Sequence, residues 1–282
     1  MLENELDLAL SLAKQASEAI LEYYAKDIVA EEKLGIDDHY EPVTDADREA
    51  SRIVVNGIAS VFPDDAVLSE EETDETTARL KKSRCWMIDP IDGTAGFVAK
   101  DGDFAVQIGL AIGGEPVLGV VAIPFYNEVQ WAVKGCGAFR SVKGSSPAVM
   151  MTSPEAERSR MAMVASRHHY GKRLDRIVDH FGIATIVRRG SVGLKTGLIA
   201  SAKCDIYINP GRRTKFWDTC APQIILTEAG GRLTDLFGER IRYDRKDVQN
   251  HNGILATNGR SHELIVRELQ PLLREFGRER VE

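Results

Sequence analysis

The chain has 282 residues, 43% of them hydrophobic, so it is long enough to bury a substantial core as one large α/β unit or two intimate subdomains. Its formal net charge of −7 argues against a nucleic-acid coat or a membrane-surface binder, because both need broad basic surfaces. A small anionic ligand is compatible with this charge, since a bound divalent cation can reverse the local field. No stretch approaches the ~20 apolar residues of a membrane span. We therefore expect neither a nucleic-acid nor a membrane partner.

The amino-terminal segment is acidic (Glu3, Glu5 and Asp7), whereas a secretory signal begins with a basic flank. The cysteines form no Cys-x-x-Cys pair, and no histidine lies at zinc-finger spacing from them. Both observations predict a cytoplasmic protein with free, buried thiols. The cysteines are Cys85, Cys136, Cys204 and Cys220.

The first half of the chain predicts helices followed by an antiparallel sheet. Apolar residues recur at helical spacing over 6–24, and a second helix is predicted over 48–58. The apolar run 86–88 predicts a buried strand. Glycines and short apolar runs then predict antiparallel strands at 104–112, 116–123 and 128–133.

After residues 143–147 the pattern changes to alternating strands and helices, which is typical of an α/β arrangement. Strands are predicted at 161–166, 184–187 and 205–208, and helices at 172–181 and 193–202. Another helix is predicted at 223–229, with Asp218 as its N-cap, Pro222 in its first turn and Gly230-Gly231 as its stop.

The predicted fold class is therefore α/β, in two intimate subdomains of one catalytic domain with a boundary near residue 146. Residues 1–146 form an N-terminal α+β half built on the antiparallel sheet. Residues 147–282 form a smaller C-terminal α/β half. We expect metal binding in the first half and substrate recognition in the second.

The most informative motif is Trp86-Met-Ile-Asp-Pro-Ile-Asp-Gly-Thr94. Two carboxylates, Asp89 and Asp92, follow the predicted buried strand, and Pro90 stiffens the turn between them. Gly93 allows a sharp turn, and the Thr94 hydroxyl follows it. Mg²⁺ in proteins is usually held by a few carboxylates together with substrate phosphates. A lone Asp-x-x-Asp is more often a solvated acidic loop than a metal site. The motifs found elsewhere in the chain decide between these two interpretations.

The companion motifs lie in three other segments. Val43-Thr-Asp-Ala-Asp47 begins a helix, and Leu68-Ser-Glu-Glu-Glu72 carries an apolar run into three acids. Far downstream, Lys215-Phe-Trp-Asp-Thr-Cys-Ala-Pro222 introduces the helix that ends at Gly230-Gly231. As a set, these motifs resemble the inositol monophosphatase superfamily of metal-dependent, lithium-sensitive phosphatases.

The resemblance covers nearly the whole chain and is strongest to the 3′(2′),5′-bisphosphate nucleotidase branch. It implies a layered α-β-α-β-α sugar-phosphatase-like fold. Many branch members have Lys-Glu after the Asp-Gly-Thr motif, whereas this chain has Ala95-Gly96. The segments most similar to the branch are 164–169, 190–195, 217–226, 230–235, 246–248 and 252–257.

The resemblance implies a site for two or three Mg²⁺ ions. Glu70, Asp89 and Asp92 would hold the first ions together with the Ile91 carbonyl oxygen, and Asp218 would complete the second site from across the cleft. Two neighbouring ions can stabilise both the attacking and the leaving oxygen of an in-line displacement. Thr94 and Asp47 resemble the pair that orients and deprotonates the water nucleophile.

Substrate contacts are expected mainly from the second half. The amides of Gly93 and Thr94 would hold phosphate oxygens if they begin a helix or nest. Basic side chains away from the metal ions would bind a second phosphate, with Arg167, Arg212 and Arg213 as further candidates, whereas Trp217 is expected in the core. The remaining candidates for substrate binding are Ser166, His169, Gly190, Ser191, Lys195 and Lys215.

The sequence thus predicts a Mg²⁺-dependent phosphomonoesterase that hydrolyses the 3′-phosphate of 3′-phosphoadenosine 5′-phosphate to give AMP. The 5′-phosphosulfate analogue is a further candidate substrate. One alternative is an inositol-1-monophosphatase or related sugar phosphatase, which would need hydroxyl-recognising acids in the cleft. An alternative of another class is an inactive phosphate-ligand sensor or scaffold. The expected partner is a small phosphorylated substrate, and relatives are commonly homodimers.

Overall fold

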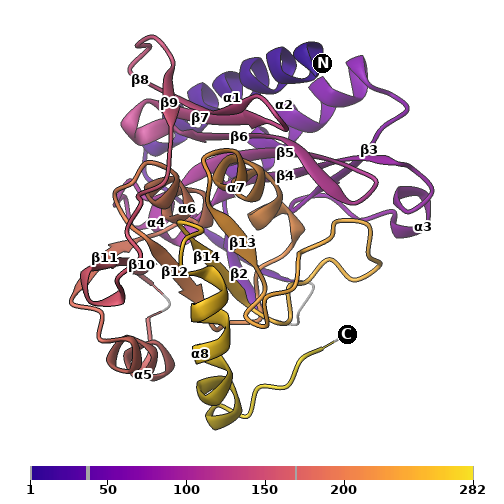
Figure 1. The fold of residues 1–282 in the computed structure, drawn as a ribbon. Helices are drawn as coiled ribbons and strands as arrows, with labels where there is room; N and C mark the ends of the chain where they lie inside the picture. The colour runs from indigo at the N-terminus through magenta and orange to yellow at the C-terminus, as the bar shows by residue number, and fades with distance from the viewer. Residues whose placement is uncertain (1, 36–38, 169, 282) are drawn as a thin grey trace.

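The computed structural model describes residues 2–35, 39–168 and 170–281. Its helices and sheets alternate in five layers (Figure 1), and this arrangement confirms the predicted α-β-α-β-α fold. The first layer is the helix pair α1 (Glu3–Tyr24) and α2 (Asp45–Val61). The central layer is the pair α6 (Val192–Ala200) and α7 (Phe216–Glu228), and the last contains α5 (Lys172–Phe181) and α8 (His262–Glu275). No helix in the described ranges has the length and apolar character to cross a membrane.

A seven-stranded sheet separates the first helix pair from the central one. Its strands lie in chain order, with β3 parallel to β4 and every later pair antiparallel. The long strands β4, β5 and β6 are almost entirely buried because helices cover both of their faces. The strands are β3 (Ala66–Ser69), β4 (Arg84–Asp92), β5 (Ala105–Ile112), β6 (Glu115–Ile123), β7 (Glu128–Val133), β8 (Gly137–Val142) and β9 (Ala148–Met150).

A five-stranded sheet of order β11-β10-β12-β14-β13 lies between the central helices and the last layer. β10 pairs in parallel with β11 and β12, whereas β14 is antiparallel to β12 and β13. The strands are β10 (Ala162–Ser166), β11 (Thr185–Arg189), β12 (Ile206–Asn209), β13 (Arg232–Thr234) and β14 (Ile254–Thr257).

The remaining elements are short connections and one hairpin-like pair of strands outside the main sheets. β1 (Glu31–Leu34) and β2 (Tyr40–Val43) pair antiparallel and precede α2. The short helices are α3 (Thr76–Arg79), α4 (Thr94–Val98) and the 3₁₀ turns η1 (Pro124–Tyr126) and η2 (Arg158–Arg160).

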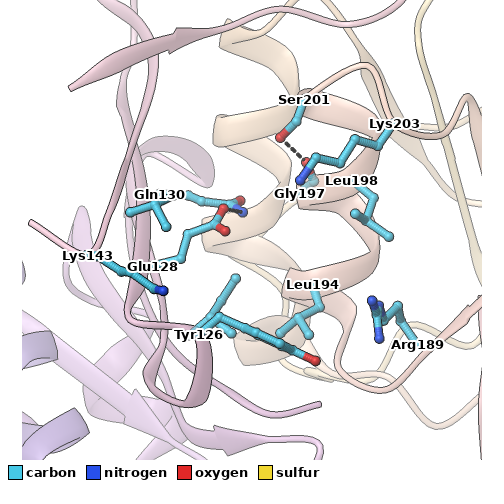
Figure 2. Close-up of a pocket in the computed structure, with 12 residues that line it drawn as sticks. Tyr126, Glu128, Gln130, Lys143, Arg189, Leu194, Gly197, Leu198, Ser201 and Lys203 are labelled. Carbon is cyan, nitrogen blue, oxygen red and sulfur yellow. Dashed lines mark hydrogen bonds between the residues drawn. The ribbon is translucent and has the colours of Figure 1, made fainter. Parts of the chain in front are cut away.

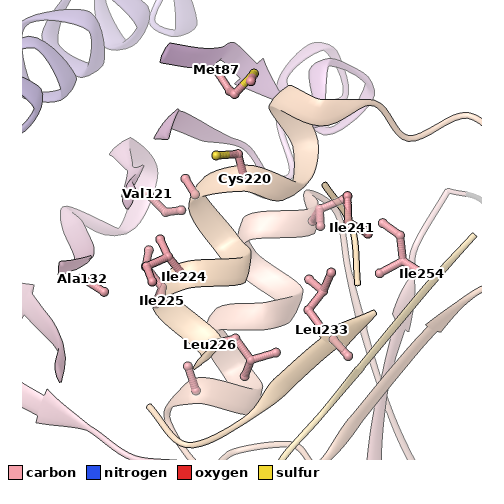
Figure 3. Packing of buried hydrophobic residues seen from close by; sticks show 14 of the residues in the cluster. Met87, Val121, Ala132, Cys220, Ile224, Ile225, Leu226, Leu233, Ile241 and Ile254 are labelled. Carbon is pink, nitrogen blue, oxygen red and sulfur yellow. The ribbon is translucent and has the colours of Figure 1, made fainter. Parts of the chain in front are cut away.

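Helix α7 joins the two halves of the chain. It comes from the second half but packs on the first sheet, where Cys220, Ile224 and Ile225 belong to one buried cluster with Met87 and Val121 (Figure 3). Two strand glycines allow this close approach: a Cβ at Gly109 would lie 2.8 Å from the Ala221 amide nitrogen, and one at Gly119 would lie 2.5 Å from the Ala221 carbonyl oxygen.

We expect Gly119→Ala to destabilise the fold by about 1–3 kcal/mol, because the added methyl group must push α7 away from β6. The same displacement moves Asp218 near the start of α7, so activity should fall as well. Urea unfolding measures the first effect and phosphate release the second. Gly171→Ala is the matched control, because a Cβ there meets nothing within 4 Å and the backbone is extended. Equal stability of the two variants would contradict this account of α7 packing.

Most sequence-predicted elements are confirmed with shifted ends, and three predictions need comment. Asp218 is not the N-cap of α7: Lys215 is, so Asp218 is the third helical residue and Pro222 lies well inside the helix. The cysteines are free as expected, but Cys136 is exposed because it lies in the turn between β7 and β8. The division near residue 146 stays a prediction, and the last strand of the first sheet ends at Met150.

Candidate metal and phosphatase site

The site begins where β4 ends. The register between β4 and β5 shifts between Asp89 and Asp92, as expected where Pro90 interrupts a ladder by lacking an N–H. Both aspartates are buried, and Asp218 reaches them from α7. One carboxylate oxygen from each of these three residues lies within 4.8 Å of the others. The structure therefore brings together acids that are separated by more than a hundred residues of sequence.

These three carboxylates suit a divalent cation. Burial and mutual repulsion hold the pKa values of Asp89 and Asp218 well above the ordinary range. A cation bound between these carboxylates would therefore stabilise their ionised forms. The Asp89 Oδ1 atom is buried and has no hydrogen-bond partner among the described residues. Mg²⁺ prefers oxygen ligands, and this cluster offers three carboxylates, one of them with an unpaired buried oxygen.

Asp92 is oriented by donors from two other elements. Its Oδ2 atom accepts hydrogen bonds from Ser191 Oγ at 2.6 Å and from the Gly193 amide at 2.9 Å, both at the start of α6. Gln107 on β5 donates its side-chain amide to the same oxygen. These three donors fix the orientation of the Asp92 carboxylate within the cluster.

Asp218 has a similar support. Its Oδ2 atom accepts the backbone N–H of Lys215 at 2.6 Å, so the carboxylate stabilises the first turn of α7 and is itself fixed by it. The Lys215 ammonium forms an ion pair with Glu41 on β2, with Nζ 2.6 Å from Oε1. The predicted contact between Lys215 and substrate stays a prediction.

Glu70 lies next to the three-carboxylate group but is held by a lysine. Its backbone N–H bonds to the Ile88 carbonyl oxygen at 3.1 Å, which fixes the segment after β3 beside β4. Lys33 on β1 places its Nζ 3.1 Å from Glu70 Oε1 and also pairs closely with Glu71. The predicted metal-binding role of Glu70 stays a prediction, and Lys33 is the cation that faces it here.

The structure brings together the predicted catalytic pair. Thr94 Oγ1 lies 3.4 Å from Asp47 Oδ1 and donates a hydrogen bond to the Ile91 carbonyl oxygen at 3.1 Å. The other Asp47 oxygen accepts both the N–H and the hydroxyl of Thr44, the N-cap of α2. Burial raises the pKa of Asp47 to about 7, and the charges of Glu71 and Glu70 add to the effect. A carboxylate with such a pKa is suited to proton transfer near neutral pH.

Lys195 lies behind the carboxylates. Its side chain is 4% exposed and its Nζ lies 5.1 Å from the centre of the Tyr207 ring. Burial lowers its pKa to about 8, against the opposing attraction of Asp92 and Asp218. Its positive charge therefore offsets the acid cluster from the protein side, and its predicted contact with substrate stays a prediction.

The glycines of the two site turns, Gly93 and Gly190, both pack closely against Asp103. A Cβ at Gly93 would lie 2.6 Å from the Asp103 carbonyl oxygen and 3.2 Å from the Ser191 nitrogen. The Gly190 amide donates to Asp103 Oδ2 at 2.9 Å, so the N–H of Gly190 and the hydroxyl of Ser191 bond to carboxylates of the protein. The predicted contacts of Gly93, Gly190, Ser191 and Ser166 with substrate stay predictions. His169 lies outside the described residues.

A basic cluster flanks these turns. Arg167 follows β10 and lies 2.8 Å from Asp103 Oδ2, and Arg189 at the end of β11 lies 3.4 Å from Asp103 Oδ1. His168 Nε2 is 3.1 Å from Asp101, which also receives Arg167 at 3.3 Å. Both arginine side chains remain about one-third exposed, at 34% and 35%. They can therefore still accept a ligand anion on their open side.

Sequence reasoning missed the supporting residues Lys33, Gln107, Asp103 and Arg189. Gln107 had a visible signal, because it is a polar residue in the middle of the otherwise apolar run 104–112. Lys33 had none: its strand is charged and short, and its role depends on the pairing of β1 with β2.

A five-layer α/β fold with a buried carboxylate cluster beside a threonine–aspartate pair defines a metal-dependent phosphatase. The chain belongs to the inositol monophosphatase family, whose model matches residues 1–274. It is 28% identical over 274 residues to the Thermotoga maritima fructose-1,6-bisphosphatase/inositol-1-monophosphatase, covering 97% of this chain and 99% of that protein.

Two proteins named CysQ are similar to this chain to a comparable degree. The chain is 31% identical over 258 residues to the 3′(2′),5′-bisphosphate nucleotidase CysQ of Salmonella typhimurium, covering 89% of this chain and 99% of that protein. The crystal structure of CysQ from Bacteroides thetaiotaomicron aligns with a TM-score of 0.76 at 27% identity, covering 91% of this chain and 98% of that one.

Proposed function

We propose that the protein is a Mg²⁺-dependent phosphomonoesterase that removes the 3′-phosphate of 3′-phosphoadenosine 5′-phosphate and releases AMP and inorganic phosphate. The 5′-phosphosulfate analogue would be a second substrate, because it differs only at the group distant from the reacting phosphate. The observation that carries the nucleotide assignment is the basic cluster of Arg167, His168 and Arg189 beside the carboxylate site. Lithium inhibition and a cytoplasmic location are part of the same proposal.

The metal would be held by Asp89, Asp92 and Asp218, with Glu70 and the Ile91 carbonyl oxygen as further ligands. When bound, Mg²⁺ activates water as a nucleophile and neutralises charge on the transferred phosphoryl group. The protein's own contribution is orientation: Gln107, Ser191 and Gly193 fix Asp92, and the first turn of α7 fixes Asp218.

The Thr94 hydroxyl and the Asp47 carboxylate would orient the attacking water and take up its proton. Thr94 is well placed for this because it follows the Asp-Gly turn directly and contacts Asp47 at 3.4 Å. Asp47 stays available as a base because its second oxygen carries both hydrogen bonds from Thr44. Removing a positioned base typically lowers a rate by about 10²–10⁴-fold.

Recognition of the second phosphate would fall to the basic cluster. The 5′-phosphate carries charge well away from the reacting 3′-phosphate, so it needs cationic partners outside the metal site. Arg167 and Arg189 present guanidinium groups there, held in place by Asp101 and Asp103. Guanidinium groups bind phosphate through paired N–H donors, which supports this assignment.

The second candidate is hydrolysis of a monophosphorylated sugar or inositol. The likeness to the Thermotoga maritima fructose-1,6-bisphosphatase/inositol-1-monophosphatase over 97% of this chain favours it. It uses the same carboxylates and the same Thr94–Asp47 pair, so only a substrate comparison separates the two candidates.

We expect activity to fall on the acid side of neutral pH. The Asp47 pKa is raised to about 7, so below that pH the carboxylate is protonated and cannot accept a proton. kcat/KM should therefore drop about tenfold per pH unit below about pH 7 and level off above it. Because the pKa of Asp47 is raised in the folded protein, the free energy of unfolding should fall as pH rises from 3.8, the ordinary pKa of the group, to about 7. A flat profile between pH 5 and 8 would contradict the role given to Asp47.

The proposed function is tested by following 3′-phosphoadenosine 5′-phosphate and Mg²⁺ with ³¹P NMR. The expected products are inorganic phosphate and AMP, with EDTA stopping the reaction. Accumulation of adenosine 3′-phosphate would show cleavage at the wrong end. No hydrolysis at all would refute the nucleotide assignment.

A further inference from the structure

A separate cavity of about 320 Å³ lies along α6, between that helix and the β7–β8 end of the first sheet. Figure 2 shows Glu128 and Gln130 facing the helix across it. Leu194 and Leu198 supply an apolar wall from α6, and the Tyr126 ring lies below. None of the residues assigned above to metal binding or water activation lines this cavity. It shares one residue, Arg189, with the basic cluster proposed for the second phosphate.

The inner wall has an unused hydrogen-bond acceptor. Gln130 is only 3% exposed, and its Nε2 donates to Glu128 Oε1 at 2.8 Å. Its Oε1 atom has no hydrogen-bond partner in the part of the chain that the structure describes. A buried amide oxygen left unpaired costs about 1–3 kcal/mol, so this wall lacks a donor.

Helix α6 leaves room for that oxygen. A Cβ at Gly197 would lie 2.4 Å from Gln130 Oε1, so any larger residue at this position would displace the amide. The glycine lowers the intrinsic stability of the helix. Its presence mid-helix keeps the amide in place beside the cavity.

The mouth of the cavity is cationic. Lys143, Lys203 and Arg189 line it together with a single carboxylate, Glu128. Within residues 2–35, 39–168 and 170–281, neither lysine forms an ion pair with an acid. Arg189 is 3.4 Å from Asp103 Oδ1 yet 35% exposed. The lining therefore combines one buried acceptor, Gln130 Oε1, and one half-buried carboxylate, Glu128, with an excess of positive charge.

We propose that this cavity is a second ligand site, for a small organic anion whose opposite end carries hydroxyl or amino donors. The donors satisfy Gln130 Oε1 and Glu128, and the anionic group binds Lys143 and Lys203. The volume is at the lower end of the range for small-molecule pockets, which matches a compact metabolite. The wall helix also holds Asp92 through Gly193, so an occupant touches the same element as the phosphatase site.

The test is calorimetric titration of the full chain in Mg²⁺-free buffer. The probes are gluconate, a hydroxylated carboxylate, and taurine, an aminated sulfonate, with acetate as an anion that lacks donors. At least one probe should bind with a Kd of about 1 mM or tighter, and acetate about tenfold more weakly. If both probes bind more weakly than that, or acetate binds equally well, the proposal is wrong.

Two variants locate the binding. Lys143→Ala combined with Lys203→Ala, and separately Gln130→Met, should each weaken the probe about tenfold or more. Lys81→Ala combined with Lys82→Ala is the matched control, because both lysines are exposed and lie outside the cavity. The lysine variants should keep wild-type phosphatase activity. Unchanged probe affinity in the Lys143 and Lys203 double variant overturns the proposal even if Gln130→Met fails to fold.

Discussion

Asp89→Asn is expected to lower kcat/KM by about 10³-fold or more while making the metal-free protein more stable. The loss follows because Asp89 Oδ1 is the orphaned oxygen of the carboxylate cluster, and an amide is a much weaker ligand for Mg²⁺. The gain follows because the substitution removes one charge from a buried group of like charges. In EDTA, the free energy of unfolding should rise by about 1–2 kcal/mol.

Phosphate release and urea unfolding with and without Mg²⁺ check both parts. Asp64→Asn, at an exposed position, is the matched control and should change neither quantity. Wild type should gain stability on adding Mg²⁺, whereas Asp89→Asn should gain little. A variant that keeps a tenth of wild-type activity, or that loses stability in EDTA, would show that Asp89 is not part of a metal site.

Thr94→Val is expected to lower kcat by about 10²–10⁴-fold with Mg²⁺ binding almost unchanged. Valine keeps the shape and volume of threonine but removes the hydroxyl that contacts Asp47 Oδ1 and the Ile91 carbonyl oxygen. The carboxylate cluster is not altered, so the loss should appear in turnover rather than in metal affinity.

Three variants make this result specific. Thr94→Ser keeps the hydroxyl and should recover most of the activity, whereas Thr73→Val, at an exposed threonine, should be indistinguishable from wild type. Asp47→Asn should lose activity to the same extent as Thr94→Val, and combining the two should add little, because the residues act as one unit. Additive losses would contradict the paired role of Thr94 and Asp47.

The fold and the acid motifs could be predicted because both depend on local sequence. The strand that ends at Asp89 and Asp92 is a continuous apolar run, and the amphipathic pattern of α1 sets its buried face. Asp47 and Thr94 are separated by 47 residues, and their pairing was expected only from the resemblance to a known family. The structure brings them within 3.4 Å of each other.

The supporting contacts could not be predicted, because they depend on long-range geometry. Ser191 adopts a positive φ of +54°, a conformation that is uncommon for serine and that its sequence context does not indicate. In this conformation its hydroxyl donates a hydrogen bond to Asp92, which lies 99 residues earlier in the chain. The expected N-cap at Asp218 was wrong for a related reason. An aspartate at the third helical position can accept the backbone N–H of the N-cap residue, as Asp218 does for Lys215. The helix therefore begins three residues earlier than an N-cap at Asp218 predicts.

We propose that the carboxylate site of this chain serves a bisphosphorylated nucleotide. The most direct measurement is kcat/KM with Mg²⁺ for 3′-phosphoadenosine 5′-phosphate and inositol 1-phosphate side by side, with lithium added to each. We predict a preference for the nucleotide of about 10²-fold or more, as two charge-assisted contacts to the second phosphate would give, and lithium inhibition of both reactions. A preference for inositol 1-phosphate would keep the metal site and contradict the nucleotide assignment.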